Sequence, residues 1–243
     1  MSTDNKTFDD HFDHSARLNL EGERAVWIKN RAKINQIYKK VRKYIKNAGT
    51  ACEVGVGDGY LLRLLCKSGL KVVGIDISKY LVKKLRNDFE KEGLEIELIQ
   101  GDFSKINLKK DQFDLFFCLD VLEHIHDVGK AIENIKKSLC TGGLLIGTLP
   151  LHENLDKNMV MCPKCGHKFH RVGHHHSFDS IKGIRQLLGP QFKIIQTGEI
   201  TSLSEVSDIF YYVLRKIRNY IFRKKTVSTV YFVAKLEVHA IGL

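Results

Sequence analysis

The chain has 243 residues, a length typical of one α/β domain with additions. It contains no run of about 18 apolar residues, so we expect no membrane-spanning helix, and its polar first segment does not resemble a signal peptide. We therefore expect a cytoplasmic protein. The formal net charge of +11 at pH 7 is typical either of solvated helix faces or of a surface that attracts an anionic partner.

Short apolar runs alternate with helical patterns through most of the chain. An N-terminal extension, residues 1–48, is predicted to contain an amphipathic helix with a basic outer face at residues 20–46. A cofactor-binding core at residues 50–150 follows, with predicted strands at 50–54, 71–76, 96–100, 113–119 and 144–150 and predicted helices at 60–66, 78–91 and 128–138. This alternation indicates a parallel sheet with helices on both faces.

The remainder of the chain adds an insertion, residues 158–176, and a C-terminal segment, residues 177–243. That segment is predicted to contain helices at 178–188 and 205–223 and strands at 192–198 and 228–238. We therefore expect a single α/β domain with a Rossmann-like, mostly parallel, seven-stranded sheet. The basic amphipathic helix at 205–223 is expected to cap an acceptor pocket, and the alternative is peripheral contact with a membrane surface.

The stretch ACEVGVGDGY predicts a strand, a glycine loop and the start of a helix. Gly55, Gly57 and Gly59 would allow a sharp turn and bring backbone N–H groups close to a ligand at the helix N-terminus. The dinucleotide fingerprint G-x-G-x-x-G is not met, because Tyr60 follows Gly59. The loop is therefore not expected to bind NAD.

Two acids follow the next two predicted strands. Asp76 ends one of them, where a carboxylate can accept two hydrogen bonds from ribose hydroxyls. Asp102 follows the other, at a place where it can meet an exocyclic amine. Together they favour a ligand that contains adenosine.

Five segments resemble, in order, the motifs of class I S-adenosylmethionine-dependent methyltransferases of the small-molecule, quinone-biosynthesis type. They are EVGVGDG, VVGIDIS, QGDF, FDLFFCLDVLEHIHD and GGLLIGTLP. The resemblance covers residues 50–150 well and the last two strands loosely. It implies that Glu53 and the glycine loop hold the methionine end of the cofactor, Asp76 the ribose and Asp102 the adenine amine. Further contacts implied by these motifs are Ile77, Phe103 and Leu119.

The segment LEHIHD offers His124 and His126 as candidates to remove a proton from the methyl acceptor, with His124 the better placed. The opposing interpretation is that Glu123 and His124 only brace the turn into the next helix. The Asn/Asp-Pro-Pro-aromatic motif, which enzymes that methylate nucleobase amines often carry here, is missing from LDVL. This argues against base N-methylation.

The insertion contains the only closely paired cysteines among the six in the chain. Cys162 and Cys165, followed by His170 and His174, have a spacing that predicts a tetrahedral zinc site. Similar insertions occur in a subset of the resembled family, which supports these two histidines over His167, His175 and His176. Four protein ligands would close the site, so we expect a structural zinc ion in a wall or lid of the acceptor pocket.

The sequence thus predicts an enzyme that transfers a methyl group from S-adenosylmethionine to a hydroxyl, or as a second choice a carbon, of a small or lipid-linked molecule. The alternative is an RNA-directed methyltransferase or a nucleic-acid-binding zinc protein, because a compact metal knuckle and a basic surface suit such partners. A third interpretation is a cofactor-binding protein without activity.

Overall fold

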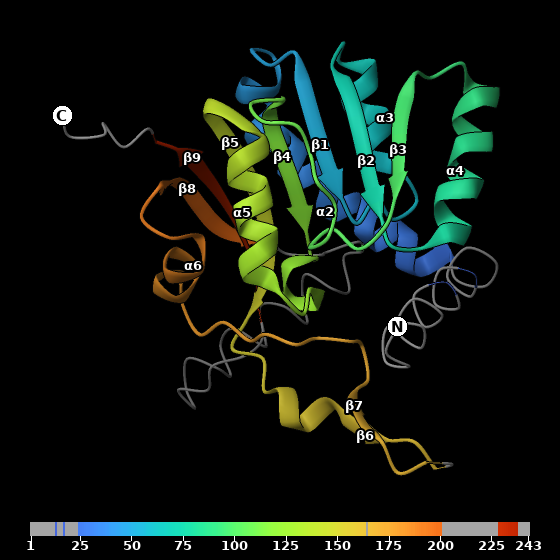
Figure 1. Ribbon diagram of the computed structural model, residues 1–243, viewed down its shortest axis with the longest axis vertical. Helices are drawn as coiled ribbons and strands as arrows, with labels where there is room; N and C mark the ends of the chain where they lie inside the picture. Colours follow the sequence, from blue (N-terminus) through green and yellow to red (C-terminus); the bar gives the residue numbers. More distant parts are fainter. Residues whose placement is uncertain (1–12, 14–16, 18–23, 164, 201–227, 238–243) are drawn as a thin grey trace, which may run out of the picture.

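The structure is a computed structural model that describes residues 13, 17, 24–163, 165–200 and 228–237 (Figure 1). The elements of the sheet layer and its helices are, in order, α2 (Arg24–Ile45), β1 (Thr50–Val54), α3 (Tyr60–Lys67), β2 (Lys71–Asp76), α4 (Lys79–Glu92), β3 (Ile96–Gln100), β4 (Phe113–Leu119), α5 (Val128–Ser138), β5 (Leu139–Leu151), α6 (Ile181–Leu188), β8 (Phe192–Ile200) and β9 (Ser228–Leu236). The short 3-10 helix η1 (Leu122–His124) follows β4. The insertion contains a second one, η2 (Leu155–Asn158), and the strands β6 (Met159–Met161) and β7 (Lys168–His170).

Seven strands form one sheet in the order β3-β2-β1-β4-β5-β9-β8. Strands β1 to β5 run parallel to one another, whereas β9 runs antiparallel to both β5 and β8. The predicted mostly parallel, seven-stranded Rossmann-like fold is therefore confirmed. In such sheets the carboxyl ends of the parallel strands meet at one edge, which is the usual place for a ligand.

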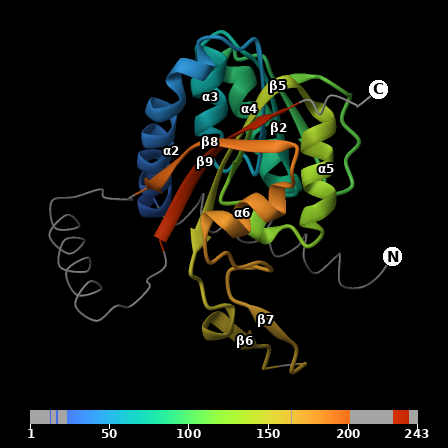
Figure 2. The ribbon, with the colours of Figure 1, turned by 90° about the vertical axis from the view of Figure 1, so that its left-hand side faces the viewer.

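Helices cover both faces of the sheet, as the near-continuous apolar strands require (Figure 2). On one face α2, α3 and α4 pack against the sheet, and α2 contributes the buried residues Ile37, Val41 and Ile45. On the other face α5 and α6 bury Ile132, Ile135, Ile184 and Leu188. None of the helices among the described residues is long and apolar enough to cross a membrane.

The part of the chain after β5 differs most from the expectation. Strand β5 continues to Leu151, and β6 and β7 form a small separate hairpin in the insertion, beyond the carboxyl ends of the parallel strands (Figure 1). Helix α6 begins three residues later than predicted, because the Oγ of Ser180 accepts a hydrogen bond from the backbone N of Gly183 and caps the helix there. The predicted helix at 205–223 lies outside the described residues.

Candidate active site

The glycine loop connects β1 to α3 and has a backbone that requires glycine. Gly55, Gly57 and Gly59 have left-handed angles, with φ of +74°, +51° and +72°. At Gly55 the space is closed as well, because a Cβ atom there would lie 2.4 Å from Cγ2 of Val121. The glycine loop and the loop after β4 therefore approach each other too closely for any side chain at this position.

Asp76 holds the same loop from the neighbouring strand. Its Oδ2 accepts a hydrogen bond from the backbone N of Val56 at 3.0 Å, and its Oδ1 accepts one from the backbone N of Ser78 at 2.9 Å. Burial raises the pKa of Asp76 to about 6, although both hydrogen bonds act in the opposite direction. Because each carboxylate oxygen has a second lone pair, Asp76 can still accept hydrogen bonds from a ligand.

Glu53 lies in β1 just before the glycine loop, and only 3% of it is exposed. Its Oε2 has no hydrogen-bond partner among the described residues. Burial, followed by the negative charges of Asp58 and Asp76, raises the pKa of Glu53 well above its usual range. A buried polar atom without a partner costs free energy. A ligand that brings a cation or a hydrogen-bond donor to this place would remove the cost.

Asp102 follows β3, beside Asp76. The two strand ends are joined where the backbone N of Gly101 donates to the backbone oxygen of Asp76 at 2.9 Å. The carboxylate of Asp102 accepts a hydrogen bond from the Oγ of Ser104 at 2.7 Å and pairs with the Nζ of Lys105 at 2.8 Å. Partial burial raises the pKa of Asp102, but the bonds from Lys105 and Ser104 outweigh it, and the net shift is downward.

Three further predicted cofactor contacts lie near these acids. Ile77 follows Asp76 and Leu119 ends β4, and both are partly exposed. Phe103 is different, because it is only 4% exposed and its ring packs against Phe116 with the centroids 5.6 Å apart. The ring belongs to the hydrophobic core, so any contact of Phe103 with a cofactor is limited to its backbone. The place of Phe103 among the cofactor contacts stays a prediction.

The loop after β4 carries an acid that the sequence analysis did not select. Asp120 has a left-handed backbone, with φ of +54°. Its backbone N donates to the Oγ1 of Thr148 at 2.8 Å, and this hydroxyl donates to the Oδ1 of Asp120 at 2.7 Å. Lys33 of α2 forms an ion pair with the other carboxylate oxygen. Asp120 could have been identified from the sequence, because it is a single acid directly after the apolar run FDLFFCL, at the edge of the sheet where ligands bind.

The two predicted catalytic histidines have different surroundings. His124 is partly buried, and its Nδ1 lies 3.2 Å from the backbone oxygen of Gly173 in the insertion. Burial, followed by the nearby His174, lowers the pKa of His124 to about 4, so the ring is neutral at pH 7. His126 is exposed, and its ring lies against that of His175 with the centroids 5.3 Å apart. Of the two, only His124 is enclosed by the insertion.

The insertion contacts the turn that carries His124. The backbone N atoms of His175 and His176 donate to the backbone oxygen of Glu123 at 2.7 and 3.3 Å. The rings of His124 and His174 pack edge to face, with their centroids 4.6 Å apart. Residues 173–176 therefore cover the turn after β4, next to Asp120.

The predicted metal ligands lie in different parts of the insertion. Cys162 and Cys165 lie at the tip of the hairpin formed by β6 and β7, where the backbone N of Cys162 donates to the backbone oxygen of His167 at 2.8 Å. His170 pairs with Met159 at the other end of the hairpin, and three residues of strand separate it from the tip by about 10 Å. Among the described residues, no group of three converging ligand atoms includes either cysteine. The four-ligand zinc site therefore stays a prediction.

Two other groups of side chains do converge, and both include His174. One consists of Glu153, His170 and His174, and the other of Glu123, His124 and His174, with the ligand atoms of each group within 4.8 Å of one another. The Oε2 of Glu153 lies 2.5 Å from the Nδ1 of His174. No local pattern links Glu153 to a histidine 21 residues later, so sequence reasoning missed it.

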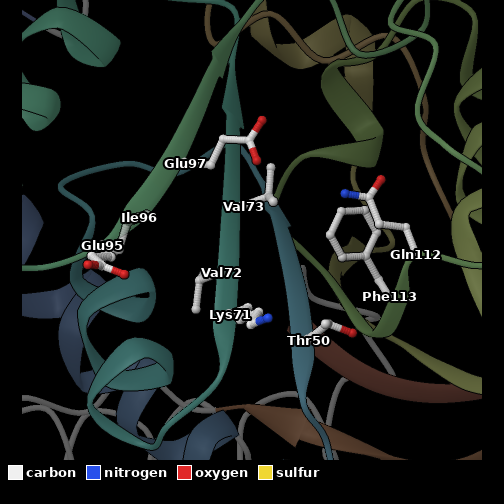
Figure 3. Close-up of a pocket in the computed structure, with 9 residues that line it drawn as sticks. All are labelled: Thr50, Lys71, Val72, Val73, Glu95, Ile96, Glu97, Gln112 and Phe113. Atoms are coloured by element: carbon white, nitrogen blue, oxygen red, sulfur yellow. The ribbon is translucent and has the colours of Figure 1, made fainter.

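A cavity of about 460 Å³ lies at the opposite edge of the sheet (Figure 3). Its lining comes mainly from the first residues of β1 to β4 and the segments just before them: Thr50, Lys71, Val72, Val73, Glu95, Ile96, Glu97, Gln112 and Phe113. Open parallel sheets bind ligands at the carboxyl ends of their strands instead. We therefore assign no ligand to this cavity.

Comparison with known proteins agrees with the geometry of the carboxyl edge. Residues 52–147 match a family described as "Methyltransferase domain". The ubiquinone biosynthesis O-methyltransferase of Coxiella burnetii is 32% identical over 93 residues, which are 38% of this chain and 40% of that protein. The match thus spans about two fifths of the length of this relative.

Solved structures with low sequence identity share the fold across almost the whole chain. An S-adenosylmethionine-dependent methyltransferase from Clostridium acetobutylicum has a TM-score of 0.63 at 16% identity and covers 94% of this chain and 99% of its own. The N-methyltransferase NodS from Bradyrhizobium japonicum, in complex with S-adenosyl-L-homocysteine, has a TM-score of 0.61 at 15% identity and covers 92% and 97%. Residues 52–147 are therefore similar to a methyltransferase domain, and the chain shares the fold of these solved structures.

Proposed function

We propose that this chain, whose residues 52–147 are similar to a methyltransferase domain, transfers the methyl group of S-adenosylmethionine to a hydroxyl of a small or lipid-linked molecule. One observation carries the proposal: the buried Oε2 of Glu53 has no hydrogen-bond partner within the described part of the chain. Glu53 lies near the end of β1, beside a glycine loop in which Gly55 has no room for a side chain. These features suit a cationic ligand that the backbone approaches closely.

The residues of the carboxyl edge fit S-adenosylmethionine. Glu53 would meet the cationic methionine end, Asp76 would accept hydrogen bonds from the ribose, and Asp102 would accept one from the adenine amine. The cofactor supplies a methyl group that its sulfonium already activates and leaves as a neutral thioether. The task of the protein is then to align the acceptor, exclude water and manage the acceptor's proton.

The acceptor side of the site is formed by the loop after β4 and by the insertion. His124 and His174 lie there with their rings in contact, and we place the acceptor hydroxyl beside them. The hydroxyl must lose its proton as the new oxygen–carbon bond forms and the carbon–sulfur bond breaks. The name of the Coxiella burnetii relative, a ubiquinone biosynthesis O-methyltransferase, supports an oxygen acceptor on a small or lipid-linked molecule.

The experiment is to incubate the purified chain with S-adenosylmethionine carrying a labelled methyl group, in the presence of either a cell lipid and metabolite extract or total RNA. We expect label in the small-molecule fraction, in a product whose NMR spectrum contains a methoxy signal, and none with Asp76→Ala. Label in RNA would favour the nucleic-acid-directed alternative, and a C-methyl product would replace the oxygen acceptor by carbon. If S-adenosylhomocysteine does not bind, the proposal fails.

A further inference from the structure

We infer that Asp120 accepts the proton of the acceptor hydroxyl, and that Lys33 of α2 is a positioning residue that holds the carboxylate of Asp120 in place. The inference deepens the proposed function and rests on it. It replaces His124, the proton acceptor expected from the sequence, by the acid that directly follows β4.

The topology of the sheet places Asp120 where a ligand is expected. The chain adds β2 and β3 on one side of β1, and β4 and β5 on the other, so the strand order reverses between β1 and β4. Open α/β sheets bind ligands outside the carboxyl ends of the strands at such a point. Val54 of β1 pairs with Cys118 of β4, and the glycine loop and Asp120 therefore lie on the two sides of it.

The carboxylate of Asp120 is fixed by two other elements. The Oγ1 of Thr148 in β5 donates to Oδ1 at 2.7 Å, and Lys33 of α2 forms an ion pair with Oδ2. The backbone of Asp120 has a φ of +54°, a conformation that is costly for a residue other than glycine and that occurs preferentially at functional sites. A group held in this way needs little reorganisation when the acceptor binds.

An acceptor can reach Asp120 more easily than His124. The side chain of Asp120 is 34% exposed, and each carboxylate oxygen has two lone pairs, so it can still accept a hydrogen bond from a hydroxyl. The ring of His124 packs against that of His174, and its Nδ1 lies 3.2 Å from the backbone oxygen of Gly173. The insertion therefore covers His124 and leaves Asp120 open to a ligand.

The proton transfer is balanced within the proposed reaction. As the O–H bond of the acceptor breaks, its proton moves to Asp120 and its electron pair stays on the oxygen. The oxygen forms a bond to the methyl carbon, the carbon–sulfur bond breaks, and the electron pair of that bond remains on the sulfur. The ammonium group of Lys33 stabilises the negative charge that develops on the acceptor oxygen. Asp120 then releases the proton to solvent.

Helix α2 becomes part of the acceptor site through Lys33. Two residues earlier in the same helix, the Nε of Arg31 pairs with the Oδ2 of Asp58 in the glycine loop at 2.7 Å. The helix therefore contacts the loops on both sides of the point where the strand order reverses. The N-terminal extension thus contributes to the site, although none of the five resembled motifs lies in it.

The test measures transfer of labelled methyl groups to the lipid and metabolite extract by the natural chain and by Asp120→Ala. We expect the variant to be slower by about 100-fold or more, because a positioned proton acceptor contributes at least this much. Its dissociation constant for S-adenosylhomocysteine should equal that of the natural chain, which also shows that the variant is folded.

Added formate tests whether the missing group is a proton acceptor. This small carboxylate can occupy the space that Asp120→Ala leaves, so it should restore part of the rate, whereas chloride at the same concentration should not. Asp120→Asn fills that space with an amide, and it should be as slow as Asp120→Ala without responding to formate. A slow Asp120→Ala variant that formate does not accelerate would overturn the inference.

Asp111→Ala is the matched control. Asp111 also has a left-handed backbone, with φ of +51°, and its carboxylate lies 3.7 Å from the Nζ of Lys110. It precedes β4 and therefore lies at the opposite edge of the sheet. We expect Asp111→Ala to transfer methyl groups at the natural rate, and a loss equal to that of Asp120→Ala would overturn the inference.

Lys33→Met tests the positioning residue. We expect methyl transfer to fall by about 10-fold or more, with the affinity for S-adenosylhomocysteine and the stability in urea unchanged. Lys33→Arg, which keeps the charge, should recover most of the rate, and Lys39→Met, an exposed change in the same helix, should have no effect. A loss of stability in Lys33→Met without a change in rate would show that the ion pair only attaches α2 to the loop after β4.

Failure of the inference and failure of the proposed function give different results. A natural chain that labels no small molecule would overturn the proposed function, and this inference with it. A natural chain that labels a small molecule, together with an Asp120→Ala variant that does so at the same rate, would overturn this inference alone.

Discussion

The Nδ1 of His174 lies 2.5 Å from the Oε2 of Glu153, and the two side chains are only 13% and 8% exposed. This contact connects the segment after β5 to the end of the insertion, 21 residues later. Because a carboxylate accepts the hydrogen bond, the contact places the proton of His174 on Nδ1. The ring of His174 also packs against His124, so the insertion contacts the turn after β4 through side chains as well as through the backbone bonds to Glu123.

Glu153→Gln should destabilise the fold of the insertion. The variant replaces a hydrogen bond to a charged, buried group, and such bonds contribute about 1.5–3 kcal/mol to the free energy of unfolding. Urea denaturation would measure the loss. Glu90→Gln, an exposed change in α4, is the control and should alter the free energy of unfolding by about 0.5 kcal/mol at most. Equal stability of the two variants would contradict a structural role for Glu153.

Asp76→Ala should weaken the binding of S-adenosylhomocysteine by about 10- to 100-fold. The estimate follows from about 1.5–3 kcal/mol for hydrogen bonds from ribose hydroxyls to a charged acceptor. Isothermal titration calorimetry measures the change, and Asp179→Ala, at an exposed acid before α6, serves as the control. An unchanged dissociation constant for Asp76→Ala would remove Asp76 from the cofactor site.

The affinity for S-adenosylhomocysteine should fall as the pH falls below about 6. Burial raises the pKa of Asp76 from 3.8 to about 6, so the carboxylate is ionised above this pH and protonated below it. Only the ionised form accepts hydrogen bonds with full strength on both oxygens, so the dissociation constant should rise by up to about tenfold per pH unit. Calorimetry between about pH 5 and about pH 8 would show this slope. Asp76→Asn should reduce it, and an equal slope in both proteins would assign the titration to another group.

Gly55→Ala should lower the free energy of unfolding by more than the strain of a left-handed alanine backbone alone explains. The new Cβ atom would lie 2.4 Å from Cγ2 of Val121, in addition to a cost of about 1–2 kcal/mol for an alanine with φ of +74°. Gly93→Ala is the matched control, because its φ is +66° and nothing lies within 4 Å of the added atom. We expect Gly55→Ala to lose more stability in urea denaturation than the control.

A second substitution isolates the clash at Gly55. Val121→Ala removes both methyl groups that the new Cβ atom would meet, so the double variant Gly55→Ala, Val121→Ala should recover part of the lost stability. A double variant no more stable than Gly55→Ala would show that backbone strain, and not the contact between the two loops, accounts for the loss.

The core of the fold was predictable because its signals are local. The runs TACEV, KVVGID, IELIQ and FDLFFCL are apolar and short, and each forms a strand with the predicted bounds. The helix at 128–138 was also predicted with its observed bounds. The start of α6 was misplaced, because Ser180 caps the helix and its role depends on the backbone angles there.

The edge of the sheet where we propose the cofactor site was also visible in the sequence. In a parallel sheet the residue that ends one strand lies beside the residues that end its neighbours, so Glu53, Asp76 and Asp102 could be placed together before any packing was known. The direction of the Phe103 ring could not be predicted in this way. Its position in the chain is at the same edge, but its ring turns into the core against Phe116.

The sequence alone determined which candidate functional residues follow which strand. A glycine loop follows the first strand, acids follow the second and third, and histidines follow the fourth. Local patterns suffice for this, since each depends on a few neighbouring residues. Only the tertiary structure decided the partners of His174. Regular spacing suggested Cys162 and Cys165, but the hairpin pairing of β6 with β7 places these cysteines at its tip. The return of the chain after β7 places His174 between Glu153 and His124, because backbone hydrogen bonds dock residues 175 and 176 on Glu123, about 50 positions earlier in the chain.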